Sequence, residues 1–218
     1  MKGAERNILF QFLQFFVFHM GFPERRCQKS IRQNIDTTIV GVDLMAQKKI
    51  LYIAMSLDGY IATKSGSVDW LIDIPGYDFY DRFIENIGVV VMGRKSYEMI
   101  LSFDVEWPYK FARSYVLTHG NKFEDTDLVK FTNISVKGLV EELSSETEKD
   151  IWVLGGGEVV REFLDSKLID EIIIGVMPIL LGEGIPLFRE YAHQTELKLL
   201  DVKQYEKGMV QLHYETLA

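Results

Sequence analysis

The sequence is poor in the residues that build covalent and metal-bound frameworks. It contains one cysteine, Cys27, so no disulfide can form within a single chain, and a zinc site built from several thiolates is excluded. The histidines are scattered and none has a metal-ligand spacing such as HExxH: His19, His119, His193 and His213. We therefore expect a metal-free protein of the cytoplasm.

Positive charge and long apolar runs are also scarce. The formal net charge of −8 argues against nonspecific binding to nucleic acid, which requires a basic surface. The apolar run Ile8–Met20 is too short to span a bilayer and is interrupted by Gln11, Gln14 and His19. We therefore expect a small-molecule partner, with no nucleic acid and no membrane.

Residues 1–46 differ in composition from residues 47–218. Six Lys/Arg against four Asp/Glu give the first segment a charge of +2, so the remainder carries −8 − 2 = −10. A signal peptide is one interpretation, but Gly21–Glu24 offers no small-x-small cleavage site. A helical partner-binding segment is another. We favour a disordered or artefactual extension, because Met45 stands just before the first convincing strand.

Short apolar runs alternate with helical periodicity through the rest of the chain. We expect buried strands at Lys49–Met55, Val89–Met92, Ser114–Thr118, Ile151–Leu154 and Glu171–Val176. We expect helices at Tyr77–Ile87 (ended by Gly88), from Arg94 to about Ile100, through Val136–Leu143, and from the glycines at 155–157 to about Leu164. This order predicts an α/β fold with a mainly parallel mixed sheet, helices on both faces and a C-terminal antiparallel hairpin around Lys207-Gly208.

The junction between the second strand and its helix has the residues of a phosphate site. A helix N-terminus presents unpaired N–H groups and a partial positive charge. Here Gly93 is followed by two cations and a hydroxyl in the same turn, Arg94, Lys95 and Ser96. A solvated basic helix start is the alternative interpretation.

A second junction of this kind follows the strand at Ile151–Leu154. Three glycines, Gly155, Gly156 and Gly157, precede Glu158 and Val159. Consecutive glycines allow a backbone to approach a pyrophosphate closely, although such a turn is also common as a tight connection. The two junctions together match the two anionic regions of a dinucleotide, and the cations of the first favour the 2′-phosphate of NADPH.

Several segments resemble the dihydrofolate reductase superfamily, in particular the branch that contains the reductase domain of the bifunctional riboflavin-biosynthesis deaminase-reductase. They occur in family order and cover most of residues 49–188. The segments are IAMSLDGYIA (53–62), VDWL (68–71), VVVMGRKSYE (89–98), SYVLTHG (114–120), IWVLGGGEVVREFL (151–164) and LIDEIIIGVMPILLGEGIPLF (168–188).

The resemblance implies a dihydrofolate reductase-like fold, an NADPH cofactor and a role for each matching residue. Ala54 would contact the nicotinamide, and Trp70 falls in the loop that covers it. Thr118 and His119 would lie near the ribose phosphate of the adenosine. The phosphates would be held by Gly93, Arg94, Lys95 and Ser96, and the pyrophosphate by Gly155, Gly156, Gly157, Glu158 and Val159.

The substrate-binding positions depart from both known patterns. Dihydrofolate reductases place a carboxylate early on the first long helix, which here falls near Tyr77 or Asp78. Riboflavin-pathway reductases carry a glutamate before their paired glycines, where this chain has Gly155. We expect reduction of a pterin-like or pyrimidine-like molecule; the alternative is a non-catalytic nucleotide-binding or regulatory protein on the same fold. Asp78 is the first candidate for the catalytic carboxylate and Asp69 the second.

A homodimer is implied by the resemblance and favoured by one apolar segment. Ile172–Leu181 (IIIGVMPILL) is long for a single buried strand, and a partner can cover surplus apolar surface. The alternative is that the segment belongs to the core.

We predict that residues 1–44 are dispensable. A chain that begins at Met45 retains the first strand, so it should melt within a few degrees of the full chain. Thermal unfolding followed by circular dichroism tests this, and loss of soluble protein on truncation would contradict it.

Overall fold

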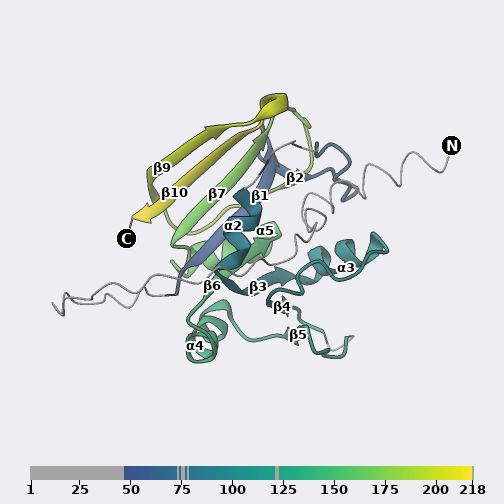
Figure 1. Ribbon diagram of the computed structural model, residues 1–218, viewed down its shortest axis with the longest axis vertical. Coiled ribbons are helices and arrows are strands. Elements are labelled where there is room, and N and C mark those ends of the chain that lie inside the picture. Colours follow the sequence, from purple (N-terminus) through teal and green to yellow (C-terminus); the bar gives the residue numbers. More distant parts are fainter. Residues whose placement is uncertain (1–46, 73, 75–76, 78, 121–122, 218) are drawn as a thin grey trace, which may run out of the picture.

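An eight-stranded sheet forms the centre of the structure (Figure 1). The computed structural model describes residues 47–72, 74, 77, 79–120 and 123–217, so the N-terminal extension and Asp78 lie outside the described residues. In spatial order the strands of the sheet are β5 (Val129–Thr132), β4 (Arg113–Leu117), β3 (Ile87–Gly93), β6 (Asp150–Gly155), β1 (Lys49–Ser56), β7 (Glu171–Met177), β10 (Val210–Leu217) and β9 (Glu196–Gln204).

Strand direction divides this sheet into two parts. From β5 to β7 all neighbouring strands are parallel, whereas β10 is antiparallel to both β7 and β9. The turn between β9 and β10 is the short 3₁₀ helix η1 (Glu206–Gly208), where the sequence predicts a hairpin. A separate antiparallel pair joins β2 (Tyr60–Ala62) to β8 (Ile185–Pro186). The mixed sheet with a C-terminal antiparallel hairpin is confirmed.

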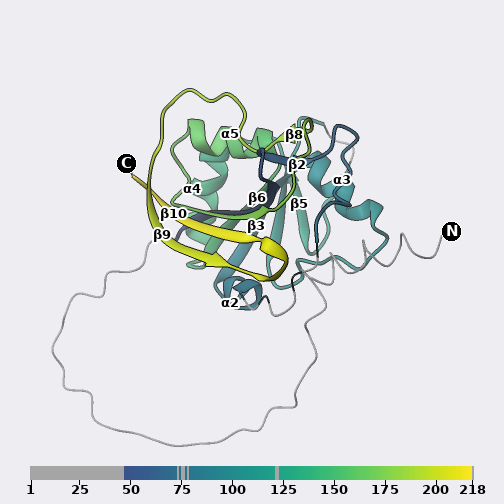
Figure 2. The ribbon, with the colours of Figure 1, turned by 90° about the horizontal axis from the view of Figure 1, so that it is seen from above.

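Helices cover both faces of the sheet. Figure 2 shows α4 (Val136–Glu146) and α5 (Gly157–Asp165) on one face and α2 (Phe79–Glu85) on the opposite face. The helix α3 (Arg94–Ser102) shares a buried cluster with α2 and so belongs to the second layer. Among the described residues, no helix combines the length and apolar character needed to cross a bilayer.

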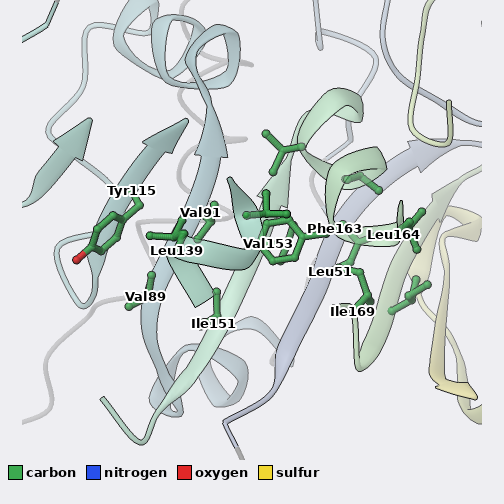
Figure 3. Packing of buried hydrophobic residues seen from close by; sticks show 14 of the residues in the cluster. Leu51, Val89, Val91, Tyr115, Leu139, Ile151, Val153, Phe163, Leu164 and Ile169 are labelled. Atoms are coloured by element: carbon green, nitrogen blue, oxygen red, sulfur yellow. The ribbon is translucent and has the colours of Figure 1, made fainter. Parts of the chain in front are cut away.

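The parallel strands are apolar throughout because both of their faces are buried. Along β3, Val89 and Val91 contribute to the cluster beneath α4 and α5, while Val90 and Met92 contribute to the cluster beneath α2 and α3. Figure 3 shows the first of these clusters, in which helix side chains such as Phe163 meet the strands. The alternating register explains why the sequence shows continuous apolar runs rather than alternation.

Two expectations about local structure are wrong. The helix predicted over Tyr77–Ile87 ends at Glu85 in the structure, and Gly88 lies within β3 instead of ending the helix. The backbone N–H of Asp150 donates to the carbonyl of Asn86, so pairing with β6 begins one residue after the helix, and Ile87 is buried as part of the strand. The edge strand β5 is absent from the sequence-based assignment, because four residues give too little periodicity.

The amino ends of the central strands are held together by a carboxylate with two basic partners. Glu171 lies 2.8 Å from Nε2 of His213 and 2.7 Å from Nζ of Lys48, and its side chain is only 13% exposed. The hydrogen bond with His213, followed by that with Lys48, lowers the pKa of Glu171 to about 2. The pKa of the neighbouring Asp150 shifts in the opposite direction, because burial raises it.

We predict that Glu171 contributes to acid sensitivity. Its pKa is lower in the folded chain, so its stabilising contribution is complete above about pH 4.3 and is lost as the pH falls toward 2. Glu171→Gln should lower the free energy of unfolding at neutral pH by about 2 kcal/mol, allowing for solvent screening, and should flatten its acid dependence. Urea unfolding over a pH series measures both, with Glu141→Gln on the exposed face of α4 as the control. An unchanged pH dependence would show that Glu171 and its two basic partners do not contribute to the acid sensitivity of folding.

Candidate functional site

The residues of both predicted phosphate junctions meet at the carboxyl edge of the parallel strands. Gly93 at the end of β3 pairs with Leu117 of β4, and Met92 pairs with Gly155 of β6. Ligands of open α/β sheets bind at this edge. The register therefore brings the ends of β4, β3 and β6 into one row, as the sequence predicts.

Small residues let the first turns of α3 and α5 approach each other. A methyl group placed on Gly93 would lie 3.2 Å from Cγ2 of Val159, and one placed on Gly156 would lie 3.6 Å from Oγ of Ser96. Gly155 adopts φ of 107°, a conformation that favours glycine, and the following peptide bond is cis. The glycines carry no side chains of their own, and the side chains of Val159, Ser96 and Ile61 therefore lie close to their backbone.

Neither of these helices carries a side-chain cap. In the described structure, α3 and α5 begin at Gly93 and Gly156 without a side chain that accepts from their first N–H groups. In α4, by contrast, Oγ of Ser135 accepts from the N–H of Gly138 at 3.2 Å. The helices at the carboxyl edge thus begin with N–H donors that no side chain caps, and such donors can bind an anion.

Charged side chains surround the same two helix starts. Arg94 donates to Glu98 at 2.6 Å within α3, and Lys95 is exposed. At the start of α5, the carboxylate of Glu158 accepts from Arg189 at 2.6 Å. A methyl group on Gly157 would lie 3.3 Å from Nε of Arg189, so this guanidinium also lies at the junction. Sequence reasoning missed Arg189, because it stands more than thirty residues further along the chain and just beyond the last segment that carries the resemblance (168–188).

Thr118 and His119 continue from β4 beside the first junction. Thr118 is buried, its N–H donates to the carbonyl of Thr132, and its Oγ1 accepts from the N–H of Gly120 at 3.3 Å. His119 is exposed. Both residues therefore lie at the carboxyl edge of the sheet.

Ala54 and Trp70 lie together on the face covered by α2 and α3. Ala54 pairs with Gly175 of β7, and Met209 packs against this glycine, since an added methyl group would lie 3.5 Å from Cε of Met209. Trp70 packs in the same cluster as Ala54, Met99 and Met177. Its indole Nε1 is buried and has no hydrogen-bond partner among the described residues.

The two candidate carboxylates differ in what the structure says of them. Asp69 is exposed and accepts from Oγ of Ser67 at 2.7 Å, a contact within its own turn. Asp78 lies outside the described residues, but its neighbour Tyr77 does not. The Tyr77 hydroxyl lies 2.6 Å from that of Tyr52 and donates to Oε1 of the buried Gln211 at 2.5 Å. The carboxylate position of dihydrofolate reductases falls near Tyr77 or Asp78 in this chain. At Tyr77, the structure has a hydroxyl that is hydrogen-bonded inside the protein.

Asp58 joins two loops beside this region. Its carboxylate accepts from Oγ of Ser56 at 2.6 Å and from the N–H groups of Leu181 and Gly182 at 3.1 and 2.7 Å. The hydrogen bond from Ser56, with help from the Gly182 and Leu181 amides, lowers the pKa of Asp58. Asp58 therefore has a structural role in tying the β1–β2 turn to the segment after β7. Across the described part of the chain, no group of three or more His, Cys, Asp or Glu side chains is arranged to hold a metal.

Comparison with known proteins identifies the family of this chain. Residues 47–211 match the RibD C-terminal domain. Two Bacillus subtilis proteins, YwjB and YyaP, are 39% and 31% identical to the chain over 172 and 183 residues, covering 78% and 79% of this chain and 98% and 96% of theirs.

Solved structures share the fold. A Shewanella protein named for riboflavin biosynthesis is 31% identical with a TM-score of 0.71, over 79% of this chain and 100% of its own. A Thermotoga maritima bifunctional deaminase and 5-amino-6-(5-phosphoribosylamino)uracil reductase is 20% identical with a TM-score of 0.62, over 79% of this chain and 57% of its own. The chain therefore belongs to the family of the RibD C-terminal domain and has the dihydrofolate reductase-like fold of that family.

Proposed function

We propose that the protein is an NADPH-dependent reductase of a pterin-like or pyrimidine-like small molecule. The observation that carries the proposal is the pair of uncapped helix starts, α3 and α5, which approach each other across bare glycine backbone. Two neighbouring anion sites suit the phosphates of a dinucleotide better than a single anion. Membership of the family supports the same activity. A cytoplasmic location accords with a chain that has one cysteine.

The residues at the carboxyl edge fit NADPH at both of its ends. The N–H groups at the starts of α3 and α5 would bind phosphate oxygens, with positive charge from Arg94, Lys95 and Arg189. Thr118 and His119 would lie toward the ribose phosphate of the adenosine. At the other end, the unpaired indole N–H of Trp70 would donate to a polar group of the cofactor or the substrate.

When bound, NADPH supplies a hydride for the reduction of a C=N or C=O group. The chain contributes position and shielding from water. The half-buried Ala54 would contact the nicotinamide, and Trp70, which packs in the same cluster, would help to shield it. The proton that follows the hydride requires an acid or an ordered water near the substrate. For that role we propose Asp78, with Asp69 as the second candidate.

We predict that NADPH binds more tightly than NADH and that Arg94 contributes to the preference. Arg94→Ala removes a cation from the first phosphate junction and should weaken NADPH by roughly ten- to a hundredfold. Arg113→Ala is the matched control, because Arg113 also pairs with one glutamate and is similarly exposed, but stands at the amino end of β4. Titration of NADPH by fluorescence or calorimetry measures the dissociation constants.

Two results of this experiment separate the parts of the proposal. An unchanged dissociation constant in Arg94→Ala would remove the first junction from the cofactor site. Tight NADPH binding without oxidation by any pterin or pyrimidine in a substrate panel would favour a non-catalytic nucleotide-binding protein. No binding of NADPH by the wild-type chain would contradict the proposed function itself.

We predict that Gly156→Ala affects the ligand more than the fold. The added methyl group would lie 3.5 Å from Ile61 and 3.6 Å from Ser96, which are ordinary contact distances, so the chain should fold with a melting temperature within a few degrees of wild type. The methyl group would nevertheless occupy the space between the two helix starts, and NADPH affinity should fall at least about tenfold. Gly138→Ala, at the capped start of α4, is the control and should leave affinity unchanged. Equal NADPH affinity in both variants would show that the cofactor does not bind between the starts of α3 and α5.

A further inference from the structure

Each of the two uncapped helix starts has a glutamate beside its arginines. At α3, Oε1 of Glu98 lies 2.6 Å from the guanidinium of Arg94. At α5, one carboxylate oxygen of Glu158 lies 2.6 Å from Arg189 and the other lies 3.1 Å from Arg161. The guanidinium groups that a phosphate would need are therefore paired with carboxylates of this chain.

The pair in α3 is not arranged to stabilise the helix. A cation at the N-terminus of a helix opposes the macrodipole, and both Arg94 and Lys95 occupy this position. In pairs four residues apart the favourable order places the acidic residue first, whereas here Arg94 precedes Glu98. Cations in such a position are expected to serve a ligand rather than the fold, and Glu98 compensates in part for their charge.

Glu98 and a phosphate at the helix start would lie on opposite sides of Arg94. A helix rises by about 1.5 Å per residue, so Glu98 stands about 6 Å further along α3 than Arg94. The first N–H groups of the helix point the other way, beyond its N-terminus. To bind a phosphate held by those N–H groups, the guanidinium of Arg94 would exchange its contact with Glu98 for one with the phosphate.

The pair at α5 places an anion where a phosphate would bind. Glu158 is the second residue of α5, and a carboxylate in the first turn interacts favourably with the macrodipole. Its partner Arg189 comes from the segment after β8, and Nε of Arg189 would lie 3.3 Å from a methyl group placed on Gly157. Glu158 thus competes with a phosphate for the same helix start and for the same guanidinium.

We propose that Glu98 and Glu158 are resident counter-ions, carboxylates that pair with the arginines of the cofactor site until the phosphates of the cofactor displace them. This inference rests on the proposed function, because it takes the ligand to be a dinucleotide. Both pairs are about half exposed, and exposed ion pairs are weak enough for a phosphate to replace the carboxylate. A displaced carboxylate stays close to the phosphate and repels it, so the two glutamates limit the affinity of the cofactor and hasten its release.

The two counter-ions should differ in the cofactors that they affect. Glu98 pairs with Arg94, whose junction carries the cations that favour NADPH, so it should oppose mainly the 2′-phosphate that NADH lacks. Glu158 stands beside the glycine turn that would hold the pyrophosphate, which NADPH and NADH share. The ratio of the NADPH and NADH affinities therefore distinguishes the roles of the two glutamates.

Neutral substitutions in the full chain test the inference. Glu98→Gln should tighten NADPH roughly three- to tenfold and leave NADH nearly unchanged, whereas Glu158→Gln should tighten both cofactors alike. Glu146→Gln is the matched control, because Glu146 is similarly exposed and pairs with Arg113 at the amino end of β4. Calorimetry measures the dissociation constants. The gain should shrink between about 0.15 M and about 1 M salt, as the screening length falls from about 8 Å to about 3 Å.

Thermal unfolding separates this role from a purely structural one. Glu98→Gln leaves the cations at the start of α3 uncompensated, so the melting temperature should fall slightly while the affinity for NADPH rises. A residue that only maintained the helix would lower both. Weaker NADPH binding in either variant would show that the glutamate orients its arginine, and binding unchanged as in Glu146→Gln would show that it does not act on the cofactor. Either result would overturn the inference.

Inorganic pyrophosphate distinguishes failure of this inference from failure of the proposed function. It has neither nicotinamide nor adenosine, so it probes the anion site at α5 alone. Glu158→Gln should bind pyrophosphate more tightly than the wild-type chain does. A gain for pyrophosphate without any binding of NADPH would contradict the reductase and support the counter-ion, whereas no gain for either ligand would overturn the counter-ion.

Discussion

The candidate site depends on the absence of side chains where β3 and β6 end. At the start of α5 even a methyl group is excluded, because one placed on Gly157 would lie 2.6 Å from the carbonyl oxygen of Pro186. The strand pair β2–β8 therefore rests directly on this helix start, and Ser96 at the start of α3 also lies close to it. Backbone packed this closely holds the N–H groups of two helices in fixed positions without any capping side chain.

The local parts of this site are readable from the sequence, and the remote parts are not. Gly93 and the glycines at 155–157 follow buried strands directly, so their place at the carboxyl edge follows from the alternation of strand and helix. Arg189 reaches the start of α5 from a segment far along the chain, and no local pattern signals that contact. The hydroxyl pair of Tyr52 and Tyr77 is hidden for the same reason, since twenty-five residues separate them.

The same distinction between local and remote information applies to the fold. Buried parallel strands and amphipathic helices show a clear hydrophobic period, and apart from their ends and the short edge strand β5 they were predicted correctly. Ile87 continues the apolar face of the preceding helix in the sequence, and only the pairing with β6 shows that it begins a strand. In β9, the face of each leucine depends on the bulge at Leu200, which is defined by the register with β10 and has no sequence signature of its own.

The two ends of the parallel strands carry different groups of residues. The ion cluster of Glu171, Lys48 and His213 lies at the amino ends, whereas the glycines and uncapped helix starts lie at the carboxyl ends. The full length of the strands separates the two groups, and residues this far apart usually affect stability additively. Substitutions at the amino ends can therefore change thermal tolerance without altering the candidate site at the carboxyl ends. Evolution or an engineer can adjust the two ends of the sheet independently.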